Sequence, residues 1–255
     1  MMKRIPFLLL IFLSAMLACS SSDENLDVFT VKEVYQTERD EANNIDSPAV
    51  WHGPNEQHWL IATAKEGDAL FVYHAENGEF LKKVGESGTQ PGDLERPNGV
   101  FVIDNLAVVV ERDNRRVQVF ELPEFNSIGF IGDTLLINPY GLFVHKLENG
   151  DYSIYVTDNY ETADEKVPPE EELGKRVHHY LFSLGENQIN WTLVKQFGET
   201  SGAGVLRIVE SIWADVEHNR LLIAEEDETQ SSVNVYQLHC TFSGIVFGRD
   251  IFDYQ

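Results

Sequence analysis

The sequence predicts an all-β protein, a β-propeller of four-stranded blades, from three observations. Apolar residues alternate or occur in short runs, and turn residues interrupt them before a helix could form. Four short apolar segments that each end in a charged residue recur at intervals of 47, 46 and 69 residues. Each lies among further strand-like segments, and four strands in about 45 residues are typical of one propeller blade. A β-sandwich is the alternative, and the fixed period favours the propeller.

The recurring segment is the second strand of each predicted blade, at residues 60–65, 107–112, 153–158 and 222–227. A strand that begins with a turn precedes each copy, at residues 46–51, 96–101, 138–143 and 210–215. An alternating strand follows each copy, at residues 70–73, 117–120, 177–180 and 233–236. A fourth strand closes the unit, as at residues 80–84 and 127–131. The long third interval contains a polar insertion, residues 160–175, which we expect to form a surface loop.

The N-terminus has the pattern of an export signal. Lys3 and Arg4 precede an apolar run, residues 5–13, which is too short to anchor the chain across a bilayer. Cys19 directly follows Ala18, as in a lipobox, so we expect Cys19 to carry lipid. The predicted location is periplasmic or tethered to the outer membrane, with the lipid as the membrane contact. An ordinary secretory signal is the alternative.

We expect three parts in the chain: a lipoprotein-type signal peptide, a polar tether with an entry segment, and an incomplete propeller, at residues 1–18, 19–38 and 39–255. Residues 248–255 resemble the approach to a further blade, and no closing strand follows them. We therefore expect about four to five blades and an exposed apolar edge where the next blade would dock.

Acidic residues dominate the composition, with 42 Asp and Glu against 19 Lys and Arg and a net charge of −23. A field of that sign repels nucleic acid and attracts cations, so we expect no nucleic-acid partner. We expect a monomer. Cys19 and Cys240 are the two cysteines, and lipidation of Cys19 would exclude an intrachain disulfide.

Charged residues gather at the predicted strand ends. Equivalent strand ends of a propeller lie around one rim, so Lys65, Arg112, Asp158 and Asp227 should converge near the central channel. Around them lie the stretches Asp46-Ser-Pro-Ala-Val-Trp51, Arg96-Pro-Asn98, Asn138-Pro-Tyr-Gly141, Glu210 with Ala214-Asp215, and Ile223-Ala-Glu-Glu-Asp227. In order and spacing these stretches resemble the β-propeller phytase family over residues 40–255, which would correspond to four of that family's six blades.

The resemblance implies a secreted, calcium-dependent phosphomonoesterase that hydrolyses myo-inositol hexakisphosphate, or phytate, or a related anionic phosphate ester. It implies several Ca²⁺ ions, whose ligands are Asp46, Glu210, Glu225, Glu226 and Asp227. Glu210, Glu226 and Asp227 would be the catalytic residues around a metal-bound water, and Lys65, Arg96, Arg112 and Tyr140 would bind phosphate. The chemistry agrees, because Ca²⁺ takes six to eight oxygen ligands and can neutralise a transferring phosphoryl group.

Several positions depart from the family pattern. Ser47 stands where the family has a second aspartate, and Gly99 and Phe101 stand where it has an asparagine and an aspartate. A lysine usual after the third of the recurring strands is also absent. Each change removes a metal or phosphate contact of the family.

Other interpretations of these residues remain open. Glu225 and Glu226 are adjacent in one strand and point to opposite faces, so at most one shares the surroundings of Asp227. Asp46 could cap a turn instead of binding metal. His178 and His179 are expected to be surface residues and not a zinc site.

The main functional alternative is a non-enzymatic binding propeller at the cell envelope. Residues 85–100 with 111–120 resemble one NHL repeat, in which Arg96 and Arg112 would be structural. The motif occurs once, whereas an NHL array would repeat it in every blade. A lactonase-like or sugar-dehydrogenase-like propeller is a third possibility, without a specific motif in this sequence.

Overall fold

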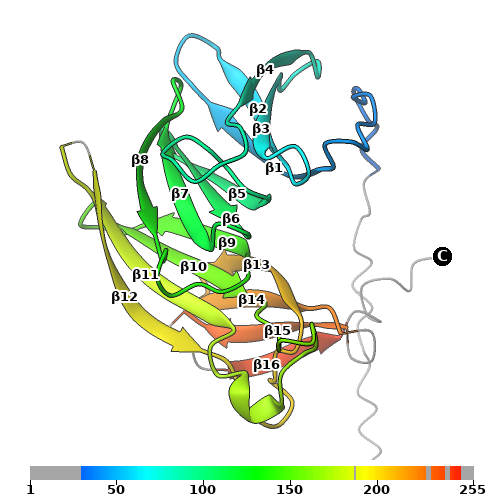
Figure 1. The fold of residues 1–255 in the computed structure, drawn as a ribbon, viewed down its shortest axis with the longest axis vertical. Helices are drawn as coiled ribbons and strands as arrows, with labels where there is room; N and C mark the ends of the chain where they lie inside the picture. Colours follow the sequence, from blue (N-terminus) through cyan, green and yellow to red (C-terminus); the bar gives the residue numbers. More distant parts are fainter. Residues whose placement is uncertain (1–29, 187, 228–230, 239–241, 248–255) are drawn as a thin grey trace, which may run out of the picture. The chain divides into compact units, whose positions relative to one another are not determined.

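The computed structural model describes residues 30–186, 188–227, 231–238 and 242–247. Within them, sixteen strands form four antiparallel sheets of four strands each (Figure 1). Each sheet is a meander, with its strands paired in chain order. The predicted all-β fold with four-stranded blades is therefore confirmed. Cys19, Cys240, the predicted signal peptide and residues 248–255 lie outside the described residues.

The first two sheets consist of β1 (Ile45–His52), β2 (His58–Ala64), β3 (Ala69–His74) and β4 (Phe80–Val84), then β5 (Pro97–Ile103), β6 (Leu106–Glu111), β7 (Arg116–Glu121) and β8 (Asn126–Ile131). The third and fourth consist of β9 (Pro139–Lys146), β10 (Tyr152–Asp158), β11 (Val177–Leu184) and β12 (Ile189–Phe197), then β13 (Val209–Asp215), β14 (Arg220–Glu225), β15 (Ser232–Gln237) and β16 (Phe242–Phe247). A single 3₁₀ turn, Glu170–Glu172, is the one helical element among the described residues. No helix in that part of the chain has the length and hydropathy needed to cross a membrane.

The sheets pack face to face, and their central strands are apolar on both sides. In β6, Val108 and Val110 join a core shared with the third sheet, whereas Ala107 and Val109 join a core shared with the first. A strand covered on both faces reads as a continuous apolar run, which explains the sequence of β6 and β10. The third and fourth sheets share a core that includes Phe143 and Ile212.

The backbone hydrogen bonds correct the alignment of the repeats. The amides of Lys65, Arg112, Asn159 and Glu226 each donate to the residue just before the first strand of their own blade. These four residues are therefore equivalent, and Asp158 and Asp227 are each one position away from the equivalence that the sequence suggested. The sequence aligned charged residues with one another, whereas the sheet is aligned by its hydrogen bonds.

A β-bulge lies at the start of the first strand in every blade, where one residue of β2, β6, β10 or β14 faces two residues of β1, β5, β9 or β13. The bulge places four residues at equivalent positions, namely Asp46, Asn98, Tyr140 and Glu210. We call these the bulge residues. A bulge bends the strand and redirects its side chain, a feature that often occurs beside active sites.

The polar insertion after β10 is attached to the propeller by Arg176, whose side chain is fully buried. Its guanidinium donates to the carbonyl oxygens of Leu206 (3.2 Å), Tyr160 (2.6 Å) and Arg207, and it lies 4.5 Å from the centre of the Tyr160 ring. It also donates to the carbonyl of Asp158 at 3.2 Å. One side chain thus holds the insertion and the loop before β13 in fixed positions.

Candidate active site

Five side chains that the sequence singled out lie in one continuous chain of contacts: Asp46, Lys65, Tyr140, Glu210 and Glu226. We call them the inner-strand cluster. The Lys65 ammonium lies 2.9 Å from the Asp46 carboxylate and donates to the Tyr140 hydroxyl at 2.8 Å. Glu210 in turn hydrogen-bonds to Tyr140 and to Glu226. The first, third and fourth blades therefore contribute to one polar site.

The close approach of β9 and β13 positions Glu210. A side chain at Gly141 would place its Cβ only 2.2 Å from the Glu210 carbonyl oxygen, so glycine is required there. The Thr157 hydroxyl donates to the same carbonyl at 2.8 Å and accepts the Gly141 amide at 2.8 Å. The backbone of Glu210 is thus fixed by the preceding blade, leaving its side chain free to enter the cluster.

The same arrangement recurs between other blades. Gly99 follows the bulge residue Asn98 and lies against the Tyr140 carbonyl, where a Cβ would be 2.9 Å away. The Thr63 hydroxyl donates to the Asn98 carbonyl at 2.8 Å, as Thr157 does to Glu210. The Pro-Asn-Gly and Pro-Tyr-Gly turns in the sequence therefore mark the points where neighbouring first strands meet.

The electrostatics of the cluster favour a shared proton or a bound cation. Burial, the charge of Glu226 and the hydrogen bond to Glu226 together raise the pKa of Glu210 to about 6, while Lys65 and Tyr140 oppose the change. Burial acts to lower the pKa of Lys65, but its hydrogen bonds to Tyr140 and Asp46 outweigh burial and raise that pKa above its usual value. The cluster therefore combines a permanent cation with a glutamate, Glu210, that is protonated more readily than usual.

Asn98 is the bulge residue of the second blade and is 1% exposed. Neither polar atom of its side chain has a hydrogen-bond partner among the described residues. Buried amides are normally paired, so an unpaired one is suited to binding water or a ligand atom. The sequence included Asn98 in the family motif without giving it a role.

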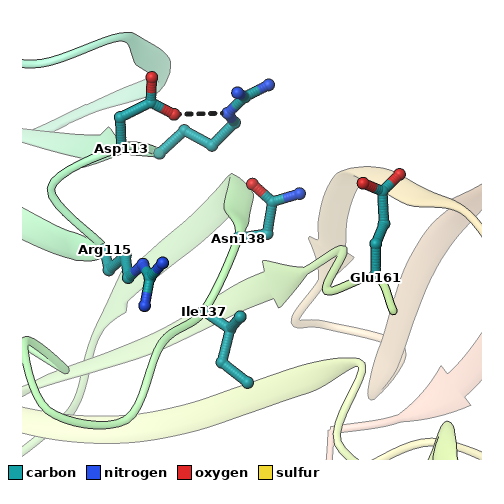
Figure 2. A pocket seen from close by; sticks show the side chains of 6 residues that line it. Asp113, Arg115, Ile137, Asn138 and Glu161 are labelled. Atoms are coloured by element: carbon teal, nitrogen blue, oxygen red, sulfur yellow. Dashed lines mark hydrogen bonds and ion pairs between the residues drawn. The ribbon is translucent and has the colours of Figure 1, made fainter. Parts of the chain in front are cut away.

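Two of the residues predicted to bind phosphate are outside the cluster. Arg96 pairs with Glu66 on the first blade, at 2.6 Å. Arg112 pairs with Asp113 at 2.7 Å and lines a separate pocket of about 290 Å³ (Figure 2). Arg115, Ile137, Asn138 and Glu161 complete that pocket, whose two arginines are balanced by two carboxylates.

Glu225 has a structural role. Its carboxylate is buried and accepts the backbone amides of Arg207, Ile208 and Asp227, at 2.5, 3.0 and 3.0 Å. Both oxygens are thereby occupied, so the predicted role of Glu225 as a metal ligand does not fit this arrangement. Asp227 is half-buried beside it, beyond the end of β14.

The structural role of the strand position that Glu225 occupies was not predicted from the sequence. Glu111, Asp158 and Glu225 are each the last residue of the second strand in their blade, and all three are buried. Asp158 accepts the amides of Ile137 and Asn138, at 3.0 and 2.7 Å. Burial raises the pKa of Asp158 to about 6. In three of the four blades an acid is the last residue of the apolar second strand, and this position was the sequence signal that could have separated these acids from the exposed ones.

The expectation that His178 and His179 lie on the surface is wrong. His178 is 1% exposed, and its Nδ1 lies 2.9 Å from the Tyr180 hydroxyl. His179 contacts the Ser153 hydroxyl at 2.8 Å, and burial lowers the pKa of both histidines to about 4. The reason is that β11 lies inside its sheet, between β10 and β12, and its residues join the cores shared with the second and the fourth sheets.

Of the five predicted calcium ligands, Glu210 and Glu226 come together. Asp46 is paired with Lys65, and Glu225 with backbone amides. In the described part of the chain, no three or more His, Cys, Asp or Glu side chains lie close enough together to hold a metal ion. The two glutamates offer the oxygen donors that Ca²⁺ prefers, so they fit a site completed by water and substrate oxygens.

Comparison with known proteins supports the fold. No family model matches the sequence, and no curated protein matches it. Among solved structures, a protein of unknown function from Bacteroides caccae matches with a TM-score of 0.54 and 13% identity, covering 87% of this chain and 73% of that one. Hydrazine synthase from Kuenenia stuttgartiensis matches with a TM-score of 0.53 and 11% identity, over 83% of this chain. The match spans 51% of the hydrazine synthase chain. At these identities the similarity concerns the fold alone.

Proposed function

We propose that this protein is a calcium-dependent phosphomonoesterase that acts at the inner-strand cluster. The observation that carries the proposal is the carboxylate pair of Glu210 and Glu226, with Lys65 and Tyr140 on its other side. A carboxylate pair that can hold a cation, next to a fixed ammonium and a hydroxyl, suits a phosphate ester, because the cation and the ammonium can contact the phosphate oxygens from two sides.

The proposed roles follow from these contacts. Glu210 and Glu226 would hold one Ca²⁺ ion, which when bound would activate water and neutralise the charge on phosphorus oxygens. Lys65 would bind a phosphate oxygen, and Asp46 and Tyr140 hold its ammonium in place at 2.9 and 2.8 Å. Tyr140 would orient Glu210, and the unpaired amide of Asn98 would donate to the substrate.

The resemblance to β-propeller phytases suggests phytate or a related phosphate ester as the substrate. Arg96 and Arg112 were expected to bind neighbouring phosphates, and both are paired with surface acids. A smaller ester with one or two phosphates would need fewer cations than phytate does. We therefore propose that the protein acts on the smaller ester at least as well as on phytate.

The test is phosphate release from phytate and from a monophosphate ester, with Ca²⁺ and again with excess chelator. Release should require Ca²⁺ and should fall by about 100-fold or more in Glu226→Gln, because the variant loses one of two carboxylate ligands. Glu217→Gln is the matched control, since Glu217 is an exposed glutamate in the turn between β13 and β14. Chelator-resistant release, or equal activity in both variants, would overturn the proposal.

A non-enzymatic binding propeller is the second candidate. It is favoured by the pairing of Arg96 with Glu66 and of Arg112 with Asp113, since an NHL-like blade would use these arginines structurally. The Glu111 carboxylate of the same blade lies 2.6 Å from buried Arg116, and Arg116 also donates to the Thr89 carbonyl at 2.8 Å. A folded protein that releases no phosphate from either ester would support this candidate.

We also propose that the protein is exported and attached by lipid at Cys19. This rests on the sequence of the first nineteen residues. Labelled palmitate should be incorporated into the full-length protein in a bacterial host and not into Cys19→Ser. Equal labelling of both would contradict lipidation at this residue.

A further inference from the structure

Two histidines face each other at the end of β1 and β2 remote from the inner-strand cluster. His52 ends β1, His58 begins β2, and the two are directly opposite in the antiparallel register. Their Nδ1 atoms lie 2.8 Å apart, in a contact exposed to solvent, and their ring centroids are 4.9 Å apart. Because a strand rises about 3.3 Å per residue, this pair lies roughly 20 Å along β1 from Asp46.

The backbone around the pair is well defined. The turn is closed by a hydrogen bond from the Gly53 amide to the Gln57 carbonyl at 2.7 Å. On the other face of the hairpin, Trp51 packs against Trp59 with ring centroids 4.8 Å apart, and Trp51 is 1% exposed. The two histidines therefore stand on a fixed frame, and adjusting them requires only rotation of the exposed His52 ring and the half-buried His58 ring.

The nitrogen separation indicates the kind of ligand. Two neutral imidazoles that share this contact hold one proton between their Nδ1 atoms, with one ring donating and the other accepting. A metal ion that replaces the proton would bind both nitrogens at about 2.0–2.1 Å. Right-angled ligands at that distance are about 2.9 Å apart, as in tetragonal Cu²⁺ or Ni²⁺ sites, whereas tetrahedral ligands are about 3.3 Å apart. The observed 2.8 Å is the length of the shared hydrogen bond; it is closer to the right-angled separation than to the tetrahedral one, so a small rotation of both rings would direct the two nitrogens at one ion.

We propose that His52 and His58 form a binding site for a divalent late-transition-metal ion, with Cu²⁺ bound most tightly. Cu²⁺ leads the divalent series in affinity for nitrogen ligands, and imidazole is one of its common ligands. Water fills the remaining coordination positions, because no third acid, histidine or cysteine lies close enough among the described residues. The bound ion joins the side chains of the last residue pair of β1 and β2. This site is independent of the proposed phosphatase activity.

Tryptophan fluorescence provides the test, because Trp51 and Trp59 are the immediate neighbours of the two histidines in the chain and Cu²⁺ quenches nearby tryptophan. Untagged protein with alkylated cysteines, titrated with Cu²⁺, should show saturable quenching at one ion per chain. His52→Gln or His58→Gln should weaken binding on the order of 100-fold, since two linked ligands become one. His74→Gln is the matched control, because His74 pairs with Trp59 and lies on the opposite face of the sheet.

A second measurement covers the case in which a variant is poorly folded. The electron paramagnetic resonance spectrum of Cu²⁺ bound to the unmodified protein should show hyperfine coupling to two imidazole nitrogens. Quenching that is unchanged in the histidine variants, quenching that does not saturate, or a spectrum without two nitrogens would each overturn the proposal.

Discussion

Replacing Glu226 by glutamine should make the metal-free protein more stable at neutral pH. Glu226 raises the pKa of Glu210 through its charge and its hydrogen bond, in addition to the larger contribution of burial. A carboxyl group with a raised pKa binds its proton more tightly in the folded state than in the unfolded state. The raised pKa therefore does not lower the free energy of unfolding below about pH 4.5, the usual pKa of a glutamate, and it lowers that free energy as the pH rises through about 6.

The size of the effect follows from that pKa. A rise from 4.5 to about 6 corresponds to roughly 2 kcal/mol at neutral pH, with 1.36 kcal/mol for each pKa unit. Solvent screening reduces this value, because Glu210 is only partly buried and Glu226 is exposed. Burial of Glu210 is the largest cause and remains in the variant. Removing the Glu226 charge should therefore raise the free energy of unfolding by about 0.5–1 kcal/mol.

Urea unfolding with excess chelator, followed by tryptophan fluorescence, would measure the change. The gain should be present at about pH 7.5 and absent at about pH 4.5, where the raised pKa keeps Glu210 protonated. Glu217→Gln should change stability by less than about 0.5 kcal/mol at either pH, because Glu217 is exposed. Destabilisation by Glu226→Gln at the higher pH, or an equal gain at both, would refute the electrostatic coupling of the two glutamates.

Three further predictions concern the frame of the site. Arg176→Met should lower the free energy of unfolding by about 3–5 kcal/mol, because buried carbonyl groups lose a charged donor. The surface variant Arg112→Met should lower it by less than about 1 kcal/mol. A similar loss in both variants, measured by urea unfolding, would contradict this reasoning. Gly141→Ala should cost about 1–3 kcal/mol and reduce phosphate release, since its Cβ would meet the Glu210 carbonyl; an unchanged melting temperature and activity would contradict the required close approach. Thr157→Val should cost about 1–3 kcal/mol in the same unfolding assay, because the Gly141 amide loses its acceptor; no loss would mean that water replaces the hydroxyl.

The sequence was sufficient to predict the blades because packing between sheets requires apolar residues on both faces of the central strands. It did not reveal the exact equivalence of the repeats. The sequence aligned Asp46 with Arg96, whereas the structure makes Asp46 equivalent to Asn98, two positions further on. A slip of two residues leaves every side chain of a strand on the same face, so the alternation of apolar residues does not distinguish the two alignments, and the hydrogen bonds of the sheet do.

The candidate site was predictable in part for a related reason. Asp46, Lys65, Tyr140 and Glu210 were identified because charged and polar residues at strand ends resembled a known pattern, and the structure places them together. Arg96 and Arg112 lie at comparable positions in the chain, but nearby acids draw them to the surface. A side chain of that length can reach in several directions, and its position in the sequence does not determine which partner it finds.

The contacts between the first strands of neighbouring blades show which positions tolerate different residue types and which do not. Gly99 and Gly141 are fixed by the carbonyl groups that lie against them, and those carbonyls belong to the backbone of the bulge residues and not to their side chains. Aspartate, asparagine, tyrosine and glutamate already occupy the four bulge positions within one chain. These positions are therefore natural points for redesign, where a new set of four side chains could be installed to recognise a different ligand while every blade keeps its present place.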